Sequence, residues 1–111
     1  MRFEDLLVRL HDGETFEKIS NEFCKANNLD CFVACDNNEV YEDDDLYEFL
    51  GLLGAEIEDF ALGFALIKTS NDSYYEVPYK NIENRYDKTL SDETVLFFDT
   101  NRIYNVSHEH N

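Results

Sequence analysis

The stretch that decides the fold class is IEDFALGFALIKTSNDSYYEVPY, residues 57–79. Its first half fits two periods, because one set of its apolar residues has helical spacing and another alternates as in a strand. The helical set is Ile57, Phe60, Ala61 and Phe64, and the alternating set is Phe60, Leu62, Phe64 and Leu66. Glycines at positions 51, 54 and 63 disfavour one long helix, so we expect a strand over residues 57–69.

The second half of this stretch, and the chain beyond it, predict hairpins. TSNDS, residues 69–73, has the composition of a turn, and YYEVPY, residues 74–79, favours a strand. Because Pro78 has no N–H to donate, we expect it at a sheet edge or at a strand end. NIENRYDKTLSDE, residues 81–93, is a predicted connecting loop with room for one helical turn. TVLFFD, TN and RIYNV, residues 94–106, predict another hairpin, followed by a frayed tail from about residue 107.

Three amphipathic helices are predicted towards the N-terminus. Their apolar stripes are Phe3, Leu6, Leu7 and Leu10, then Phe16, Ile19 and Phe23, and finally Leu46, Phe49, Leu50 and Leu53. We expect Thr15 to cap the second helix and Asp43 or Asp44 to cap the third. HDG (11–13), KANN (25–28) and Gly54 are the predicted stops, and CFVAC (31–35) is a possible short strand.

The order of these elements predicts an α+β fold in one domain, residues 1–111. The N-terminal helices should pack on one face of a C-terminal antiparallel sheet, a meander of hairpins. Nine Phe and seven Tyr among 43% hydrophobic residues provide a core, which distinguishes the chain from disordered acidic tails.

The cysteine count and the apolar runs predict a cytoplasmic protein with reduced thiols. Three cysteines, at positions 24, 31 and 35, are an odd number, which does not favour a disulfide framework. The N-terminus carries acidic residues where a signal peptide needs an uncharged core. The longest uncharged apolar run, FALGFALI (60–67), is too short to span a bilayer, so we expect no membrane association.

Charge is distributed unevenly along this chain of net charge −16. Residues 1–66 hold seventeen acidic residues against four basic ones, a net of −13, whereas residues 67–111 have a net of −3. Between Lys25 and Lys68 there are eleven acidic residues and no basic one. This asymmetry is the strongest signal in the sequence, and it predicts the kind of partner that the protein binds.

Metal binding and catalysis are disfavoured by the spacing of the candidate residues. A calcium loop that starts at Asp36 would place Tyr41 at the position of the required glycine and Tyr47 at that of the late glutamate. The cysteines include no closely spaced CxxC pair of the kind that holds structural zinc. No nucleophile motif or phosphate-binding loop is present, so we predict a protein that is not an enzyme and needs no cofactor or metal.

The acidic residues themselves are the candidate site. Acidic residues at a helix start interact favourably with the helix dipole, which accounts for Asp43, Asp44 and Asp45 as a solvated helix start. It does not account for the remaining acidic residues or for the missing basic ones. We therefore favour a recognition surface in which tyrosines supply anchor contacts. Its predicted residues are Asp36, Glu39, Tyr41, Glu42, Asp43, Asp44, Asp45, Tyr47, Glu48, Glu56, Glu58 and Asp59.

Phosphates of nucleic acids and of anionic membranes would repel this surface, so the expected partner is a basic nucleic-acid-binding protein, such as a nuclease. In size and charge the chain resembles small acidic DNA-mimic inhibitors of phages and mobile elements. These include anti-restriction proteins, uracil-DNA glycosylase inhibitors and anti-CRISPR proteins. The resemblance covers mainly residues 36–59, and YEDDDLYEFLGLLG, residues 41–54, is similar to the acidic and aromatic segments of those inhibitors. The resemblance implies a non-enzymatic inhibitor of a CRISPR or restriction nuclease, acting in the bacterial host cell.

Two other interpretations stay open from the sequence. An immunity protein that neutralises a basic toxin nuclease would use the same electrostatics on a different target. A structural or regulatory phage protein would carry its charge for solubility alone and would have no basic partner.

Overall fold

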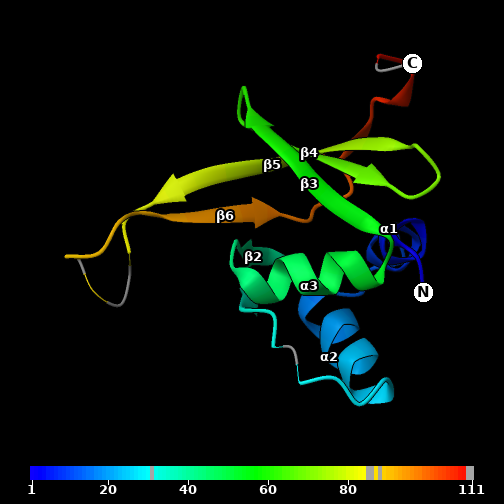
Figure 1. The fold of residues 1–111 in the computed structure, drawn as a ribbon, viewed down its shortest axis with the longest axis horizontal. Helices are drawn as coiled ribbons and strands as arrows, with labels where there is room; N and C mark the ends of the chain where they lie inside the picture. Colours follow the sequence, from blue (N-terminus) through cyan, green and yellow to red (C-terminus); the bar gives the residue numbers. More distant parts are fainter. Residues whose placement is uncertain (31, 85–86, 88, 110–111) are drawn as a thin grey trace.

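The computed structural model describes residues 1–30, 32–84, 87 and 89–109, and these residues form an α+β fold (Figure 1). Its helices are α1 (Phe3–His11), α2 (Phe16–Ala26), α3 (Asp44–Leu52) and the 3-10 turn η1 (Ser107–Glu109). Its strands are β1 (Cys35–Asp36), β2 (Glu39–Tyr41), β3 (Ala55–Ala61), β4 (Phe64–Thr69), β5 (Tyr74–Ile82), β6 (Glu93–Phe97) and β7 (Tyr104–Asn105). The predicted fold class is therefore confirmed, although the short β1–β2 hairpin precedes α3. None of the helices in these ranges has the length and apolar character needed to cross a membrane.

The helices begin where side-chain caps predict. Thr15 Oγ1 accepts a hydrogen bond from the Lys18 N–H at 3.2 Å, and Asp43 Oδ1 accepts one from the Leu46 N–H at 3.0 Å. Each of these bonds satisfies an N–H that has no partner inside its helix. At the other end of α3, Gly54 has φ +71°, and a Cβ built there would lie 2.8 Å from Ser70 Oγ. Glycine is therefore required at this stop.

All strand pairs are antiparallel, and β5 is the central strand. The strand order is β1-β2-β6-β5-β4-β3, and β7 pairs with β5 beside this path. The first part of β5 pairs with β4 through residues 74–78, and its second part pairs with β6 through residues 79–82. The predicted turn at residues 69–73 joins β4 to β5, as expected.

The predicted hairpin at residues 94–106 is wrong, because β7 pairs with β5 and not with β6. Tyr104 lies opposite Glu76, and Asn105 lies opposite Tyr75. The sheet order explains the difference, since β6 already has β2 on one edge and β5 on the other. The returning segment therefore finds its partner on the first half of β5.

Three further expectations about strands need correction. Residues 57–69 do not form one strand, because a turn at Leu62 and Gly63, with φ +55° and +82°, divides them into β3 and β4. Pro78 is not at an edge or a strand end but within central β5. Pro78 is tolerated there because it lies where β5 changes partners. It is the last residue that pairs with β4, and it lies between the residues that pair with β7 and those that pair with β6. In CFVAC only Cys35 belongs to a strand, and Cys31 lies outside the described residues.

The connecting loop and the tail also differ in detail from the sequence analysis. Asn81 and Ile82 extend β5, so the loop is shorter than predicted. The predicted helical turn falls partly on residues 85–86 and 88, which lie outside the described residues. Residues 107–109 form η1, and the Ser107 hydroxyl accepts a hydrogen bond from the Tyr74 N–H at 2.9 Å.

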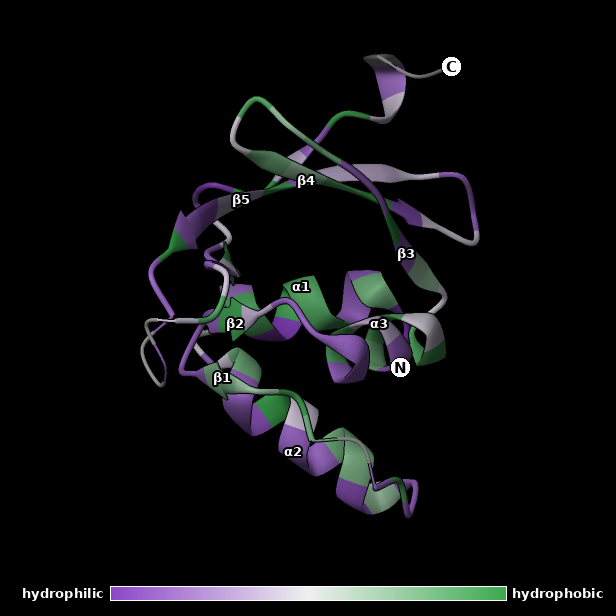
Figure 2. Cartoon of the chain, turned by 60° about the vertical axis from the view of Figure 1, so that its left-hand side comes forward, coloured by the Kyte–Doolittle hydropathy of each residue, from purple (hydrophilic) through white to green (hydrophobic). Residues whose placement is uncertain are grey.

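The core lies between the helices and one face of the sheet. Figure 2 shows α1 and α3 beneath the sheet, with α2 at the end of the molecule opposite the β3–β4 hairpin. Buried side chains from the helices include Phe3, Leu6, Phe16, Ile19, Leu46, Phe49 and Leu50, and those from the strands include Val40, Ala65, Ile67, Val77 and Leu96. The ring of Phe16 packs on Phe98 and Phe49, with centroids 4.6 Å and 5.5 Å away. This packing joins α2, α3 and the residue after β6. The β1–β2 turn is held to the same core because the Phe98 N–H donates a hydrogen bond to the Asn38 carbonyl at 2.9 Å.

Candidate partner-binding surface

The β1–β2 hairpin brings two of the predicted carboxylates together. Asp36 and Glu39 are directly opposite each other across the two-residue turn, and both side chains are exposed. Like charges at such positions destabilise a strand pair. The turn is held against α2, because the Asn38 side-chain oxygen accepts from the Phe16 N–H at 2.8 Å and the Glu17 carboxylate accepts from the Asn37 N–H at 3.0 Å. The fold therefore keeps an unfavourable pair of charges in a fixed position.

The start of α3 gathers the next group of carboxylates. Asp43 is half-buried as the N-cap, while Asp44 and Glu48 are exposed. Burial raises the pKa of Asp43, and the nearby charges of Asp45 and Asp44 raise it further. Burial is the larger cause of the raised pKa, and the charges of Asp45 and Asp44 add a smaller repulsive contribution.

Tyr47 links α3 to the chain before it. Its hydroxyl donates a hydrogen bond to Glu42 Oε1 at 2.8 Å. Burial, together with this bond and the charge of Glu42, raises the pKa of Tyr47 to about 12. Tyr47 is 40% exposed, so the pair presents an aromatic residue beside an oriented carboxylate.

A hollow of about 360 Å³ lies beside these residues, and we name it the acidic hollow. Its lining residues are Phe32, Ala34, Cys35, Asp36, Tyr41, Glu42, Asp43 and Glu93. Four of them carry carboxylates, and none is basic. Burial, more than the neighbouring acidic charges, raises the pKa of the Cys35 thiol to about 11, so this group is neutral. Among the described lining residues, no cation offsets the negative potential of the hollow.

The third predicted group, Glu56, Glu58 and Asp59, lies on β3 at the opposite edge of the sheet from β1 and β2. Glu56 lies opposite Lys68, and a β-bulge between Ile57 and Asp59 then places Asp59 opposite Leu66. Lys68 is the first basic residue after the long acidic run in the sequence, and Glu58 is among the neighbours that raise its pKa, after Tyr74. Although no basic residue lies between Lys25 and Lys68 in the sequence, the fold places Lys68 beside the carboxylates of β3.

The structure thus divides the predicted residues into two groups. Nine of the twelve lie on β1, on β2 and in or just before α3, and we name these the acidic face. They are Asp36, Glu39, Tyr41, Glu42, Asp43, Asp44, Asp45, Tyr47 and Glu48. The three residues on β3 form a separate patch beside Lys68.

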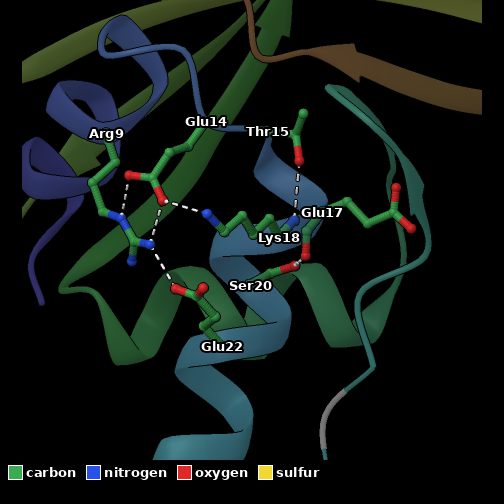
Figure 3. A network of polar contacts seen from close by, with 7 residues as sticks. All are labelled: Arg9, Glu14, Thr15, Glu17, Lys18, Ser20 and Glu22. Carbon is green, nitrogen blue, oxygen red and sulfur yellow. Dashed lines mark hydrogen bonds and ion pairs between the residues drawn. The ribbon is translucent and has the colours of Figure 1, made fainter.

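Elsewhere in the molecule, several acidic residues form ion pairs with basic ones. Arg9 Nη2 lies 2.6 Å from a Glu14 carboxylate oxygen and 2.6 Å from a Glu22 carboxylate oxygen, and Lys18 Nζ lies 3.5 Å from Glu14 (Figure 3). The hydrogen bonds to Arg9 lower the pKa of Glu14 to about 2. Further ion pairs join Lys68 to Asp72 and Arg102 to Asp99. Within the described ranges, no ion pair involves a carboxylate of the acidic face.

In the part of the chain that the structure describes, no three His, Cys, Asp or Glu side chains converge as a metal site would require. The carboxylates of the acidic face are instead spread over a strand, a loop and a helix start.

Comparisons with protein-family models, with curated proteins and with solved structures found no match to this chain. The function is therefore inferred from the arrangement of the chain's own residues.

Four residues that line the acidic hollow are outside the predicted site: Phe32, Ala34, Cys35 and Glu93. Phe32, in CFVAC, is 70% exposed, although its apolar neighbours suggested a buried strand. Glu93 precedes the β6 core residues and is far from the acidic run in sequence. The pairing of β6 with β2 brings it to the hollow, and no local pattern indicates such a pairing.

Proposed function

We propose that the protein is a non-enzymatic inhibitor whose acidic face occupies the nucleic-acid-binding groove of a basic protein. One observation carries the proposal: seven carboxylates lie on this face, and none forms an ion pair within the described residues. They are Asp36, Glu39, Glu42, Asp43, Asp44, Asp45 and Glu48. Their mutual repulsion opposes folding, and a cationic partner would relieve it.

The positions of these carboxylates suit a groove that normally binds phosphates. Four come from the short segment before and at the start of α3, and two face each other across the β1–β2 turn. The packing of Phe16 against Phe49 holds α3, and hydrogen bonds from the Phe16 and Phe98 N–H groups to Asn38 hold the β1–β2 turn. Little conformational entropy is therefore lost on binding. Tyr47 provides the aromatic contact that anchors of protein interfaces commonly supply.

The targets that fit best are nucleases of CRISPR or restriction systems, because these proteins use Arg and Lys to hold nucleic acid. The immunity-protein interpretation uses the same face and differs only in its target. A single purified toxin nuclease, substituted for the captured partner in the experiment below, separates the two.

The test is a competition with DNA. The protein is immobilised, a nuclease-treated bacterial lysate is passed over it at low salt, and retained proteins are identified by mass spectrometry. Each purified candidate is then bound to fluorescently labelled duplex DNA, and the protein is titrated into this complex. Release of the DNA with a one-to-one end point is the expected result. Simultaneous binding of DNA and protein would contradict the proposal, as would the retention of proteins that bind no nucleic acid.

A further inference from the structure

The sheet has a second apolar surface, on the side that faces away from the core. In β4 alternate side chains from Ala65 to Thr69 are buried, whereas Phe64 and Leu66 point to the opposite side. Figure 2 shows α1, α2 and α3 beneath β3, β4 and β5, and no α-helix of the described residues above them. A sheet covered on one side usually alternates apolar and polar residues, and Phe64 and Leu66 depart from this rule. We name this side of β3, β4, β5 and β7 the outer face.

The apolar residues of the outer face are not used by the protein's own core. Phe64 and Leu66 are half-buried, and neither belongs to the core cluster of the described residues or packs against it. Tyr104, on β7, lies edge-on to Phe64 with ring centroids 6.2 Å apart, and it is 53% exposed. Contiguous apolar surface of this kind is typical of interaction sites.

The outer face is continuous with the acidic face. Glu39, at one end, lies opposite Phe97 of β6. The register of β6 on β5 places Phe97 next to Pro78, and Pro78 lies opposite Phe64. Residues opposite each other in a sheet share a side of it. A row of side chains therefore runs from the acidic face to β4 across three strand spacings, about 15 Å.

Carboxylates flank the apolar centre of the outer face on both sides. Leu66 lies opposite Asp59 on β3 and opposite Glu76 on β5. Within the described residues, neither Asp59 nor Glu76 forms an ion pair, and the nearby Lys68 pairs with Asp72 at 3.8 Å. The pattern is complementary to a ligand in which basic groups flank an apolar stripe.

This charge pattern distinguishes among ligands. A second copy would bring the carboxylates of two chains of net charge −16 together, and nucleic acid or anionic lipid would also be repelled. A strand added at the β3 edge would lack the Phe60 N–H, which already donates to Asp59 Oδ1 at 2.8 Å. An amphipathic helix with Lys or Arg beside its apolar stripe has the required chemistry.

We propose that the outer face binds an amphipathic, basic helix of the partner, with the apolar side chains of the helix on Phe64 and Leu66 and its basic side chains at Asp59 and Glu76. This inference rests on the proposed function, because it assigns the helix to the protein that the acidic face binds. It adds an apolar contact to an otherwise electrostatic interface.

The test titrates the peptide acetyl-Leu-Lys-Lys-Leu-Leu-Lys-Leu-Leu-Lys-Lys-Leu-Leu-Lys-Leu-amide into the full chain and follows the binding by ¹⁵N NMR. One comparison peptide replaces every Leu by Ser and keeps the charge, and another replaces every Lys by Glu and keeps the apolar stripe. We expect saturable shifts at amides around Phe64 and Leu66 with the Leu-Lys peptide. The Ser peptide should shift amides of the acidic face only, and the Glu peptide should bind at least about tenfold more weakly.

Matched variants test the two parts of the outer face. Leu66→Thr and Glu76→Gln should each weaken binding of the Leu-Lys peptide at the outer face by about three- to thirtyfold. Leu90→Thr and Asp12→Asn, at exposed positions elsewhere, should not change it. Retained dispersion of the amide spectrum shows that each variant is folded.

The inference is overturned if the Leu-Lys peptide shifts only the acidic face, if the Ser peptide shifts the outer face equally, or if the variants and their controls lose equal affinity. It is also overturned if sedimentation shows a dimer that Leu66→Thr dissociates, because a second copy would then cover the face.

Failure here is distinguishable from failure of the proposed function. If the outer face does not respond to the peptide while the protein still displaces DNA from its partner, only the helix site is wrong. If the peptide binds the outer face but no partner releases DNA, only the inhibitor function is wrong.

Discussion

At the scale of single residues, Asp43 belongs both to a helix cap and to the acidic face. Its Oδ1 accepts from the Leu46 N–H at 3.0 Å, while burial and the charges of Asp45 and Asp44 raise its pKa. Because the pKa of Asp43 is higher in the folded state than in the unfolded state, this group favours folding most at low pH. That contribution to stability is lost as pH rises through the folded-state pKa. The hydrogen bond stabilises the helix, and the charge opposes folding.

Substitutions at Asp43 should separate these two roles. Asp43→Ala removes the cap and should lower the free energy of unfolding by about 0.5–2 kcal/mol, as measured by urea denaturation. Asp43→Asn keeps a capping oxygen and removes the charge, so it should change stability much less. Asp44→Ala, at an exposed neighbour that does not cap, is the control. Equal losses for Asp43→Ala and Asp43→Asn would show that the charge, and not the cap, matters for stability.

Glu14 should show the opposite pH dependence. Its pKa is lowered from 4.5 to about 2 by Arg9, so its contribution to stability is present above pH 4.5 and is lost as pH falls towards 2. Urea midpoints measured across this range should therefore fall less steeply in Arg9→Gln than in the wild type. Lys25→Gln is the control, because Lys25 lies in the last turn of α2, outside this ion-pair network. Parallel pH profiles for wild type and Arg9→Gln would contradict this account.

At the scale of elements, the turn between β3 and β4 carries a local conflict. Leu62 has φ +55° and is 98% exposed, so a branched apolar side chain occupies a left-handed position and buries nothing. Asn is preferred at such a position in two-residue hairpin turns, and Gly63 already occupies the next one. The hairpin forms because of the pairing on both sides, not because of its turn sequence.

Leu62→Asn should therefore raise the free energy of unfolding by about 0.5–1 kcal/mol, because Leu loses more than Asn in the left-handed region. Gly63→Ala should lower it by about 1 kcal/mol or more, since φ is +82° there. Leu90→Asn, at another exposed leucine, should have little effect. Thermal or urea denaturation checks all three, and a destabilising Leu62→Asn would contradict the assigned turn.

The difference between local signals and long-range pairing also explains which features could be predicted from the sequence. The starts and stops of α1, α2 and α3 were predictable, because caps such as Thr15 and Asp43 act within a few residues. The partner of β7 was not, because it depends on which strand edges are already occupied. For the candidate site, the carboxylates before and within α3 were found from composition. Glu93 was not found, since the pairing of β6 with β2 brings it to the hollow, and Phe32 was not found, since it lies in an apolar stretch that predicted a strand.

At the scale of the whole molecule, the net charge of −16 is concentrated and not evenly spread. The ion pairs of Arg9, Lys68 and Arg102 lie outside the acidic face. Repulsion within that face is therefore expected to be the main electrostatic term that opposes folding, and salt should screen it.

The melting temperature at neutral pH should accordingly rise with salt. An increase from about 0.01 M to about 0.15 M shortens the screening length from roughly 30 Å to roughly 8 Å. Calorimetry should show a smaller rise in the triple variant Asp43→Asn, Asp44→Asn, Asp45→Asn. The control triple Asp12→Asn, Asp72→Asn, Asp87→Asn removes the same charge from three separate exposed sites. A flat or falling trend in the wild type would refute the repulsion.

The same two triple variants provide the most direct test of the central claim, that the acidic face meets cations in the groove of a nucleic-acid-binding partner. The measurement is the affinity of each variant for the purified partner from which the protein displaces DNA. It is made by isothermal titration calorimetry at several salt concentrations. The account predicts that the Asp43, Asp44 and Asp45 triple weakens binding by about 2–5 kcal/mol and flattens its salt dependence. The control triple should cost less than about 0.5 kcal/mol. Equal losses in the two triples would show that net charge alone attracts the partner, and the proposed acidic face would be wrong.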